Sequence, residues 1–437
     1  MEVLRGTAQG GARYPSLTCA HPAAQMYERE LWEQTGLLPE GHPWLKPVRF
    51  EGTRQQHMAD YPFFQVRGHS VHEVGVGPIH AGVIEPGHFR FMCLGETVYH
   101  LEVQLGYQHR GVEALLLQRP AWTLAPLLES VCGDSAVAYA WGHCAAIEAL
   151  SGCSVGRSAE LSRAVALELE RVAIHVATLG GLATDIAFLQ GGSTYGRLRT
   201  AIINATQRVC GNRFGRGWIR PGRSSVLSDA LRQDLVQTLR AFAVDFAEIN
   251  ERMRTAHSVT ARLRGVGTVS TQAARDLGLL GVVARASGVA LDVRTELPGP
   301  VYGAAPLPLV TEPQGDCWAR VLLRMREVEQ SVAWLLQLLE GGALDGVSPQ
   351  SVREASSFAA PPELQPEALC VSLTEGTRGP VVQVLETGAG GELRHYKVQD
   401  PSLANWYGLA LAVRDNAISD FPLCNKSFDL SYCGNDL

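Results

Sequence analysis

The amino-acid sequence predicts an α+β protein that is mainly α-helical, with a long helical core and small β-sheets near each end. Residues 61–100 alternate apolar and polar residues in short runs broken by Gly and Pro, which is typical of hairpin strands. From about residue 112 to 260, apolar residues recur at spacings of three and four, which is typical of amphipathic helices. Residues 381–398 again have the pattern of a hairpin.

The composition is that of a protein with a substantial core. The chain has 437 residues, of which 46% are hydrophobic and 19% charged. The net charge of −6 and the lack of a Lys/Arg run argue against a nucleic-acid partner. No apolar stretch is long enough for a membrane span, and the N-terminus lacks a signal-peptide pattern. Ten cysteines occur without a CxxC motif, so we expect a soluble cytoplasmic chain with reduced thiols.

The elements follow in order along the chain. Residues 23–36 predict a short helix, followed by an arm rich in Pro and Gly, and residues 61–100 predict the first hairpin strands. Long helices are expected within 112–260 and over 316–341. We interpret 277–294 as a compact loop region and 361–369 as a linker. The last hairpin should turn at Gly-Ala-Gly-Gly, residues 388–391.

Cys132, in ESVCGDSAVAYA (129–140), could begin a metal site, but the place for a second cysteine is Ser135. One thiolate cannot hold a metal alone, and free cysteines are common in protein cores. Cys424 and Cys433 are too far apart in the sequence for a two-cysteine clamp. From these residues alone, a buried core thiol is the favoured interpretation.

Seven of the thirteen histidines lie between residues 57 and 109. This segment has no HExxH motif and no cysteine partners, so a zinc cluster is the less favoured interpretation. In GPIHAGVIEPGHFRF (77–91), Gly-Pro and Pro-Gly pairs predict tight turns that place His80 and His88 at a hairpin tip. Such a tip can carry binding groups, and two ordinary surface histidines are the alternative.

Two predicted helices carry charges on one face. Glu168, Arg171 and His175 lie at spacings of three and four, and Asp185 follows. Because charges inside an apolar helix are costly to bury unless they are paired, we interpret these residues as a structural charge network, and an ion-paired face exposed to solvent is the alternative. A second stripe, with its first carboxylate near the positive end of a helix, is interpreted as a structural charge ladder. This stripe comprises Asp316, Arg320, Arg324, Glu327 and Ser331.

Eight ordered strings resemble one known family. They are GPIHAGVIEPGHFRF, GETVYHLEVQLGYQHRGVE, ESVCGDSAVAYA, ELERVAIHVATLGGLATD, GRGWIRPG, GVVARASGVALDVR, GDCWARVLLRMREVEQS and DFPLCNKSFDLSYCGNDL. The family is the large subunit of group 4 nickel–iron hydrogenases, formate hydrogenlyase among them, and the 49-kDa-type quinone-site subunit of complex I. The resemblance covers residues 61–437 and implies a helical bundle with small flanking β-sheets. Residues 15–50 are similar to the end of the 30-kDa-type subunit, so we divide the chain into 1–60 and 61–437.

The resemblance also implies where a nickel–iron centre would be. The hydrogenases hold nickel with two CxxC pairs, one in each end motif. Here the first pair is Cys132 and Ser135, the second is Ser431 and Gly434, and Cys433 is one place out of register. A nickel–iron centre needs soft thiolates. We therefore expect no metal in this chain and interpret Cys132 as a relic.

The match to complex I is partial. It implies that His109 and Arg110 lie against a 4Fe–4S cluster of the partner subunit, with Cys132 nearby, and that Asp185 is a buried acid beneath a quinone cavity. The quinone tyrosine and the cluster-adjacent histidine correspond to Val137 and Gly215. Tyr139 is two residues after the first of these positions.

Together these features predict a subunit that binds no cofactor itself and accepts electrons from the 4Fe–4S cluster of a small partner subunit. The acceptor, a quinone or a soluble carrier, would lie in a cavity lined by His80, His88, Cys132, Tyr139 and Asp185. The partners implied are the small iron–sulfur subunit, a 30-kDa-type subunit and antiporter-like subunits at the cytoplasmic side of the inner membrane. An intact hydrogenase, a non-redox assembly subunit and an independent soluble enzyme are the alternatives.

Overall fold

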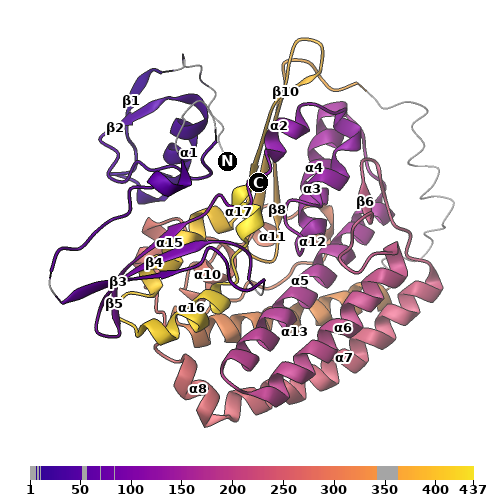
Figure 1. Ribbon diagram of the computed structural model, residues 1–437. Coiled ribbons are helices and arrows are strands. Elements are labelled where there is room, and N and C mark those ends of the chain that lie inside the picture. The colour runs from indigo at the N-terminus through magenta and orange to yellow at the C-terminus, as the bar shows by residue number, and fades with distance from the viewer. Residues whose placement is uncertain are drawn as a thin grey trace.

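A computed structural model describes residues 6, 9, 11–51, 57–68, 70–82, 84–341 and 363–437. The N-terminal lobe is formed by strand β1 (Arg13–Pro15), helix α1 (Gln25–Thr35) and strand β2 (Leu38–Glu40), and β1 and β2 pair in parallel. The predicted short helix is confirmed as α1, which ends at Gly36 with φ +78°. Figure 1 shows this lobe in indigo beside the helical body.

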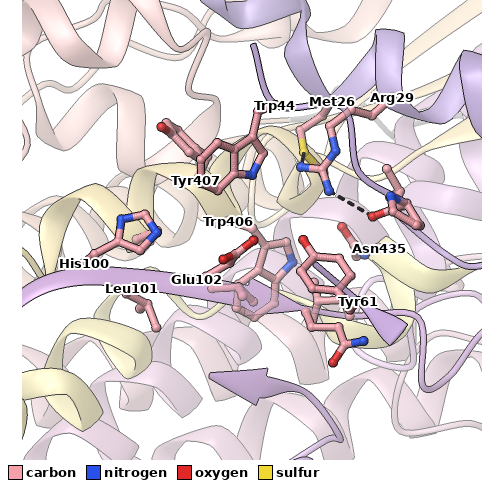
Figure 2. A pocket seen from close by; sticks show the side chains of 16 residues that line it. Met26, Arg29, Trp44, Tyr61, His100, Leu101, Glu102, Trp406, Tyr407 and Asn435 are labelled. Carbon is pink, nitrogen blue, oxygen red and sulfur yellow. Dashed lines mark hydrogen bonds between the residues drawn. The ribbon is translucent and has the colours of Figure 1, made fainter. Parts of the chain in front are cut away.

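Buried Arg49 anchors the lobe to the body. Its guanidinium pairs with Glu30 of α1 and donates from Nε to the carbonyl of Asn435 at 2.6 Å. A small open cavity lies along the same junction, and Trp44, Tyr61 and Trp406 are among the residues that line it. Figure 2 shows these rings around the cavity, which is otherwise largely apolar. The lobe therefore packs on the body through both charged and aromatic contacts.

The first sheet of the body has the order β3-β4-β5 and is antiparallel. Its strands are β3 (Val71–Val76), β4 (His88–Leu94) and β5 (Thr97–Gln104), as the alternation predicted. Phe89, Phe91 and Cys93 of β4 alternate toward the core and are fully buried.

The predicted helical core is confirmed, and α5 is at its centre. Both faces of α5 are buried, against α6, α13 and α16, as Figure 1 shows. The region 277–294, interpreted as loop, contains a helix of six residues, α10, which is too short to give a periodic signal. The helices of this body are α2 (Val112–Leu116), α3 (Ala125–Leu128), α4 (Ala136–Ser151), α5 (Arg157–Asp185), α6 (Leu189–Cys210), α7 (Asp229–Thr255), α8 (His257–Leu263), α9 (Thr271–Asp276), α10 (Gly281–Ala286), α11 (Val293–Glu296), α12 (Pro300–Ala304), α13 (Cys317–Glu340), α15 (Ser402–Ala412), α16 (Phe421–Phe428) and α17 (Tyr432–Asp436).

The second large sheet has the order β10-β9-β8, with β8 (Leu369–Glu375), β9 (Pro380–Thr387) and β10 (Leu393–Gln399). The predicted turn at 388–391 is confirmed, whereas residues 361–362 of the predicted linker are outside the described residues. A further small hairpin joins β6 (Ile219–Arg220) to β7 (Arg223–Ser224). Figure 1 shows α17 in the middle of the molecule, between the lobe and the helical body. No helix within the described ranges is long and apolar enough to cross a membrane.

Candidate functional site

The two end motifs, 299 residues apart, meet at Cys132 and Ser431. Cys132 Sγ is 3.1 Å from Ser431 Oγ, which is 3.5 Å from Cys433 Sγ. Both thiols therefore contact the same serine hydroxyl. Cys132 is 1% exposed, whereas Cys433 is partly exposed. Although Cys433 is out of register in the sequence, the structure therefore brings it to the serine that contacts Cys132, an arrangement that residue spacing did not indicate.

The contact between these thiols shifts their pKa values in opposite directions. It raises the pKa of Cys132, together with burial and the carboxylate of Asp134. It lowers the pKa of Cys433, an effect that burial opposes. Cys433 is therefore the more acidic of the two thiols.

The other two positions of the family pairs carry no thiol. Ser135 lies before α4, and its hydroxyl is 3.4 Å from Thr377 Oγ1. Gly434 lies in α17, and a Cβ there would overlap the carboxylate of Asp400. Across the described part of the chain, no three His, Cys, Asp or Glu side chains are grouped as a metal ion would require.

An ion pair between Arg378 and Asp134 closes the site on one side. Arg378 lies in the loop between β8 and β9. Its guanidinium donates to both carboxylate oxygens of Asp134 at 2.8 Å. Burial opposes the charge on Asp134, but Arg378 holds the pKa of that carboxyl well below its usual range. Sequence reasoning missed both residues. The only available signal was the place of Asp134 inside the Cys132 motif.

An open cavity adjoins the thiol pair through Arg378 and Tyr432. Of the five residues predicted to line it, only His80 and Asp185 do so. The wall of the cavity also includes Val76, Glu85 and Lys426.

The remaining three predicted lining residues lie elsewhere. His88 begins β4, and its Nδ1 is 3.2 Å from the carbonyl of Gly77, while its ring meets Phe63. Tyr139 is fully buried on α4 and donates from its hydroxyl to Asp400 Oδ2 at 2.6 Å. Cys132 is buried behind Arg378. The loop-tip prediction is wrong for His88, because the strand begins at that residue.

Asp185 is exposed at the last turn of α5, so the prediction of a buried acid is wrong for this chain. Partial desolvation raises its pKa, and the nearby ammonium group of Lys426 opposes that rise. Its carboxyl group therefore faces the cavity rather than the core.

His109 and Arg110 are tied to both the lobe and the end motifs. His109 lies 2.8 Å from the carbonyl of Asp436 through Nδ1 and 3.0 Å from Glu51 through Nε2. Arg110 donates to the carbonyls of Ser130 and Val131 at 2.9 Å and to that of Cys433 at 3.2 Å. One guanidinium, partly open to solvent, thus holds both segments that carry the thiols. Its contact with a partner's cluster stays a prediction.

The charged face of α5 is buried, so the alternative of a solvent-exposed face is wrong. Glu168 accepts hydrogen bonds from Arg171, Arg294, Ser331 and Tyr302. The spacing of three and four residues is the same for a buried network and an exposed one, so the sequence could not distinguish them.

The second charged stripe continues this network along α13. Asp316 caps α13 by accepting from the amide of Ala319, and His175 lies 2.8 Å from Glu327. Arg320 and Arg324 donate to the hydroxyl and the carbonyl of Ser427, respectively, which ties α13 to α16.

The two positions that lack the family's side chains contact each other. Gly215 has φ +72°, and a Cβ there would be 2.5 Å from Cγ2 of Val137. Val137 therefore fills the space beside Gly215, between α4 and the loop after α6.

Comparison with known proteins identifies relatives over most of the chain. The family model for the 49 kDa subunit of the respiratory-chain NADH dehydrogenase matches residues 185–436, and that for the 30 kDa subunit matches residues 3–63. Hydrogenase-4 component G of Escherichia coli (strain K12) is 28% identical, over 97% of this chain and 76% of that protein. An NADH-quinone oxidoreductase subunit of Carboxydothermus hydrogenoformans is 31% identical, over 61% of this chain and 73% of that protein. A chain of an archaeal membrane-bound sulfane sulfur reductase has the same fold, with a TM-score of 0.77 at 23% identity, over 84% of this chain and 99% of that one.

Proposed function

Because the chain belongs to the family of the 49 kDa subunit of the respiratory-chain NADH dehydrogenase, we propose that it is the large subunit of a complex I-like, hydrogenase-related membrane oxidoreductase. It accepts electrons from a 4Fe–4S cluster in a small partner subunit and passes them to an acceptor in the cavity beside Asp185. The acceptor is a quinone or another carrier, and its reduction is coupled to ion translocation. No nickel–iron site takes part.

The proposal that no nickel–iron site takes part is supported by the side chains at the four ligand positions of the two end motifs. Cys132, Ser135, Ser431 and Gly434 supply one thiol, two hydroxyls and no fourth side chain. A nickel–iron centre needs soft thiolate ligands, and the residues present do not fit it. Asp400 fills the space where a ligand at position 434 would begin.

The cavity supports the acceptor site. Its walls combine apolar side chains with a few polar groups, as in most sites for small organic molecules. Asp185, whose pKa is raised, can hold a proton near neutral pH more readily than an ordinary carboxylate. In our proposal, Asp185 supplies that proton and His80 helps to position the acceptor.

The same reasoning gives the partners and the location. We propose a peripheral position on the cytoplasmic side of the inner membrane. The neighbours are the small iron–sulfur subunit, a 30-kDa-type subunit and antiporter-like membrane subunits. The N-terminal match to the 30 kDa family supports the second of these contacts, and the net charge of −6 supports the absence of nucleic acid.

The test is metal analysis of the complex purified from its native membrane. We expect no nickel, about four iron atoms for each 4Fe–4S cluster of the small subunit, and no hydrogen uptake. Quinone reduction is then assayed with a soluble quinone. Nickel in a one-to-one ratio to the large subunit would contradict this proposal and would instead support a hydrogenase with unusual nickel ligands.

The second candidate is a non-redox coupling subunit, which the Val137–Gly215 contact favours because neither position carries the family's polar group. Asp185→Asn in the intact complex separates the two. Loss of turnover supports the redox role, whereas unchanged turnover supports the coupling subunit. Asp276→Asn, on the exposed end of α9, is the matched control and should not change turnover.

A further inference from the structure

The cavity between the N-terminal lobe and the body, the junction cavity, has unpaired polar atoms among its lining residues (Figure 2). They are Trp406 Nε1, Asn435 Oδ1 and His100 Nε2, each of which is buried and has no hydrogen-bond partner among the described residues. The side chains of Trp406 and Asn435 belong to residues that are only 3% and 1% exposed. Because a buried polar atom without a partner is costly, such atoms in folded proteins usually bind water or a ligand.

The neighbours of these atoms determine which of them donate. The indole Nε1 of Trp406 can only donate. His100 Nδ1 lies 3.3 Å from Nη2 of Arg414, which can only donate, and burial lowers the pKa of His100, so the neutral ring carries its proton on Nε2. Asn435 donates through Nδ2 to Asp436 Oδ1 at 3.0 Å, which leaves its Oδ1 as an acceptor. Within the described ranges, the wall therefore offers two donors and one acceptor.

The charged residues of the wall favour a neutral ligand. Arg29 donates to the carbonyls of Lys46 and Pro47 at 2.8 and 2.9 Å. The carboxylate of Glu102 accepts from the ammonium group of Lys46 and, at 2.7 Å, from the amide of Phe64. Both wall charges are thus engaged within the chain. A charge brought in by a ligand would be buried without a partner, which is costly.

The size and the walls of the cavity favour a small flat group. Its volume is about 60 Å³, about twice the share of one water molecule in the liquid. Its walls include the rings of Trp44, Tyr61, Trp406 and Tyr407. A carboxamide is planar and neutral, and it carries a carbonyl acceptor and an N–H donor on neighbouring atoms. Such a group therefore matches the rings, the unpaired polar atoms and the volume together.

We infer that the junction cavity binds the carboxamide group of a small neutral molecule. The carbonyl oxygen accepts from Trp406 Nε1, and the amide nitrogen donates to Asn435 Oδ1. The bound group contacts the lobe through Met26 and Trp44 and the body through His100. This site is distinct from the cavity beside Asp185 and does not rest on the proposed function.

The junction cavity lies behind α17, the helix of the C-terminal motif. Asn435 is two residues after Cys433, and its backbone carbonyl accepts from Arg49. The ring of Trp406 packs against that of Tyr432, with their centroids 4.8 Å apart. Because the ligand contacts both the lobe and α17, its binding strengthens the contact between them.

The test uses the full-length chain with ¹⁵N-labelled tryptophan and follows the eight indole N–H signals by NMR. The Trp406 signal is identified by its loss in Trp406→Phe. Acetamide should shift this signal saturably at millimolar concentrations, because so small a molecule gains little binding energy. Acetone, which lacks the donor, and acetate, which also carries a charge, should bind at least about fivefold more weakly. Trp334 is the internal control, since its Nε1 already donates to the carbonyl of Ala305 at 2.7 Å.

Asn435→Ala should weaken acetamide binding at least about fivefold and remove the difference between acetamide and acetone. Asn204→Ala on the exposed face of α6 is the matched control and should change neither. Because a change at buried Asn435 can disturb folding, the three probes are also compared on the unsubstituted chain. A Trp406 signal that does not move there, or moves equally with all three probes, would mean that water alone pairs these atoms and would overturn the inference. The assay involves no electron transfer, so this result would leave the proposed function unaffected.

Discussion

The carboxylate of Asp400 occupies the space beside Gly434 that a side chain at this position would need. A Cβ at 434 would overlap Asp400 Oδ2 and lie 2.8 Å from Ser431 Oγ. Asp400 cannot turn away cheaply, because it accepts from the hydroxyl of Tyr139 at 2.6 Å and from the amide of Ser402 at 2.7 Å. Position 434 of the C-terminal motif therefore has room only for a glycine.

Gly434→Ala should destabilise the chain by about 1–3 kcal/mol, since the added methyl group overpacks a fully buried site. Urea unfolding of the full-length chain measures the change. Gly196→Ala in α6 is the matched control, because a Cβ there meets nothing within 4 Å, and it should be neutral or slightly stabilising. Equal effects for both glycines would contradict the overlap with Asp400.

Gly215 and Val137 should show strong coupling in a double-mutant cycle. Gly215→Ala places a Cβ 2.5 Å from Val137 Cγ2, so it should be destabilising in the original chain. In a Val137→Ala background the overlap disappears, and only the cost of φ +72° remains. We expect a coupling energy of about 0.5–3 kcal/mol from urea unfolding of the four chains. Additive changes would show that Val137 does not fill this space.

Glu168→Gln should be among the most damaging changes of a charged residue. It removes the carboxylate between Arg171 and Arg294, which are both buried, and leaves their charges without this partner. The expected loss of unfolding free energy is about 3–5 kcal/mol. Glu251→Gln on the exposed face of α7 should change stability by less than about 0.5 kcal/mol. A similar loss for both would mean that the buried network contributes little.

The contact between Glu51 and His109 should give the lobe a pH window of stability. Hydrogen bonds from His109 and Gln34 lower the pKa of Glu51 to about 2 against the cost of burial, and Glu51 raises the pKa of His109. The Glu51 contribution is present above its unfolded pKa of about 4.3 and is lost toward pH 2. That of His109 is present below about pH 6.5 and is lost as pH rises through its higher folded pKa.

The stability difference between the original chain and Glu51→Gln should therefore be largest between about pH 4.3 and 6.5. Urea unfolding at several pH values measures it. In a His109→Gln background the decline above that range should disappear, while the decline at low pH should persist because Arg49 also lies near Glu51. A difference that does not vary with pH would exclude the ion pair.

Local patterns predicted the elements well because they report which face of a segment is apolar. The helix predicted over 316–341 is α13, and the hairpin predicted over 381–398 is β9 and β10. The same patterns cannot report which distant segments meet. Arg378 approaches Cys132 across 246 residues, and nothing in either local sequence specifies that contact.

The site residues were predicted less completely for the same reason. His80 and Asp185 do share a cavity, but whether a residue is buried depends on elements packed from elsewhere in the chain. Glu168 is buried because α11, α12 and α13 supply Arg294, Tyr302 and Ser331 around it. The helical periodicity of a segment shows which residues share a face, but it does not show which distant residues pack against that face.

The separation of the two thiol-bearing segments has a consequence for synthesis of the chain. Ser431 follows Cys132 by 299 residues. At roughly 5–20 residues per second, the ribosome needs about 15–60 s to make the chain between them. During that interval Cys132 has neither Ser431 nor Cys433 beside it, and Arg378 also arrives late. The nascent thiol is therefore open to oxidation, so a reducing compartment or an early-binding chaperone would determine how much of the newly made protein completes this site.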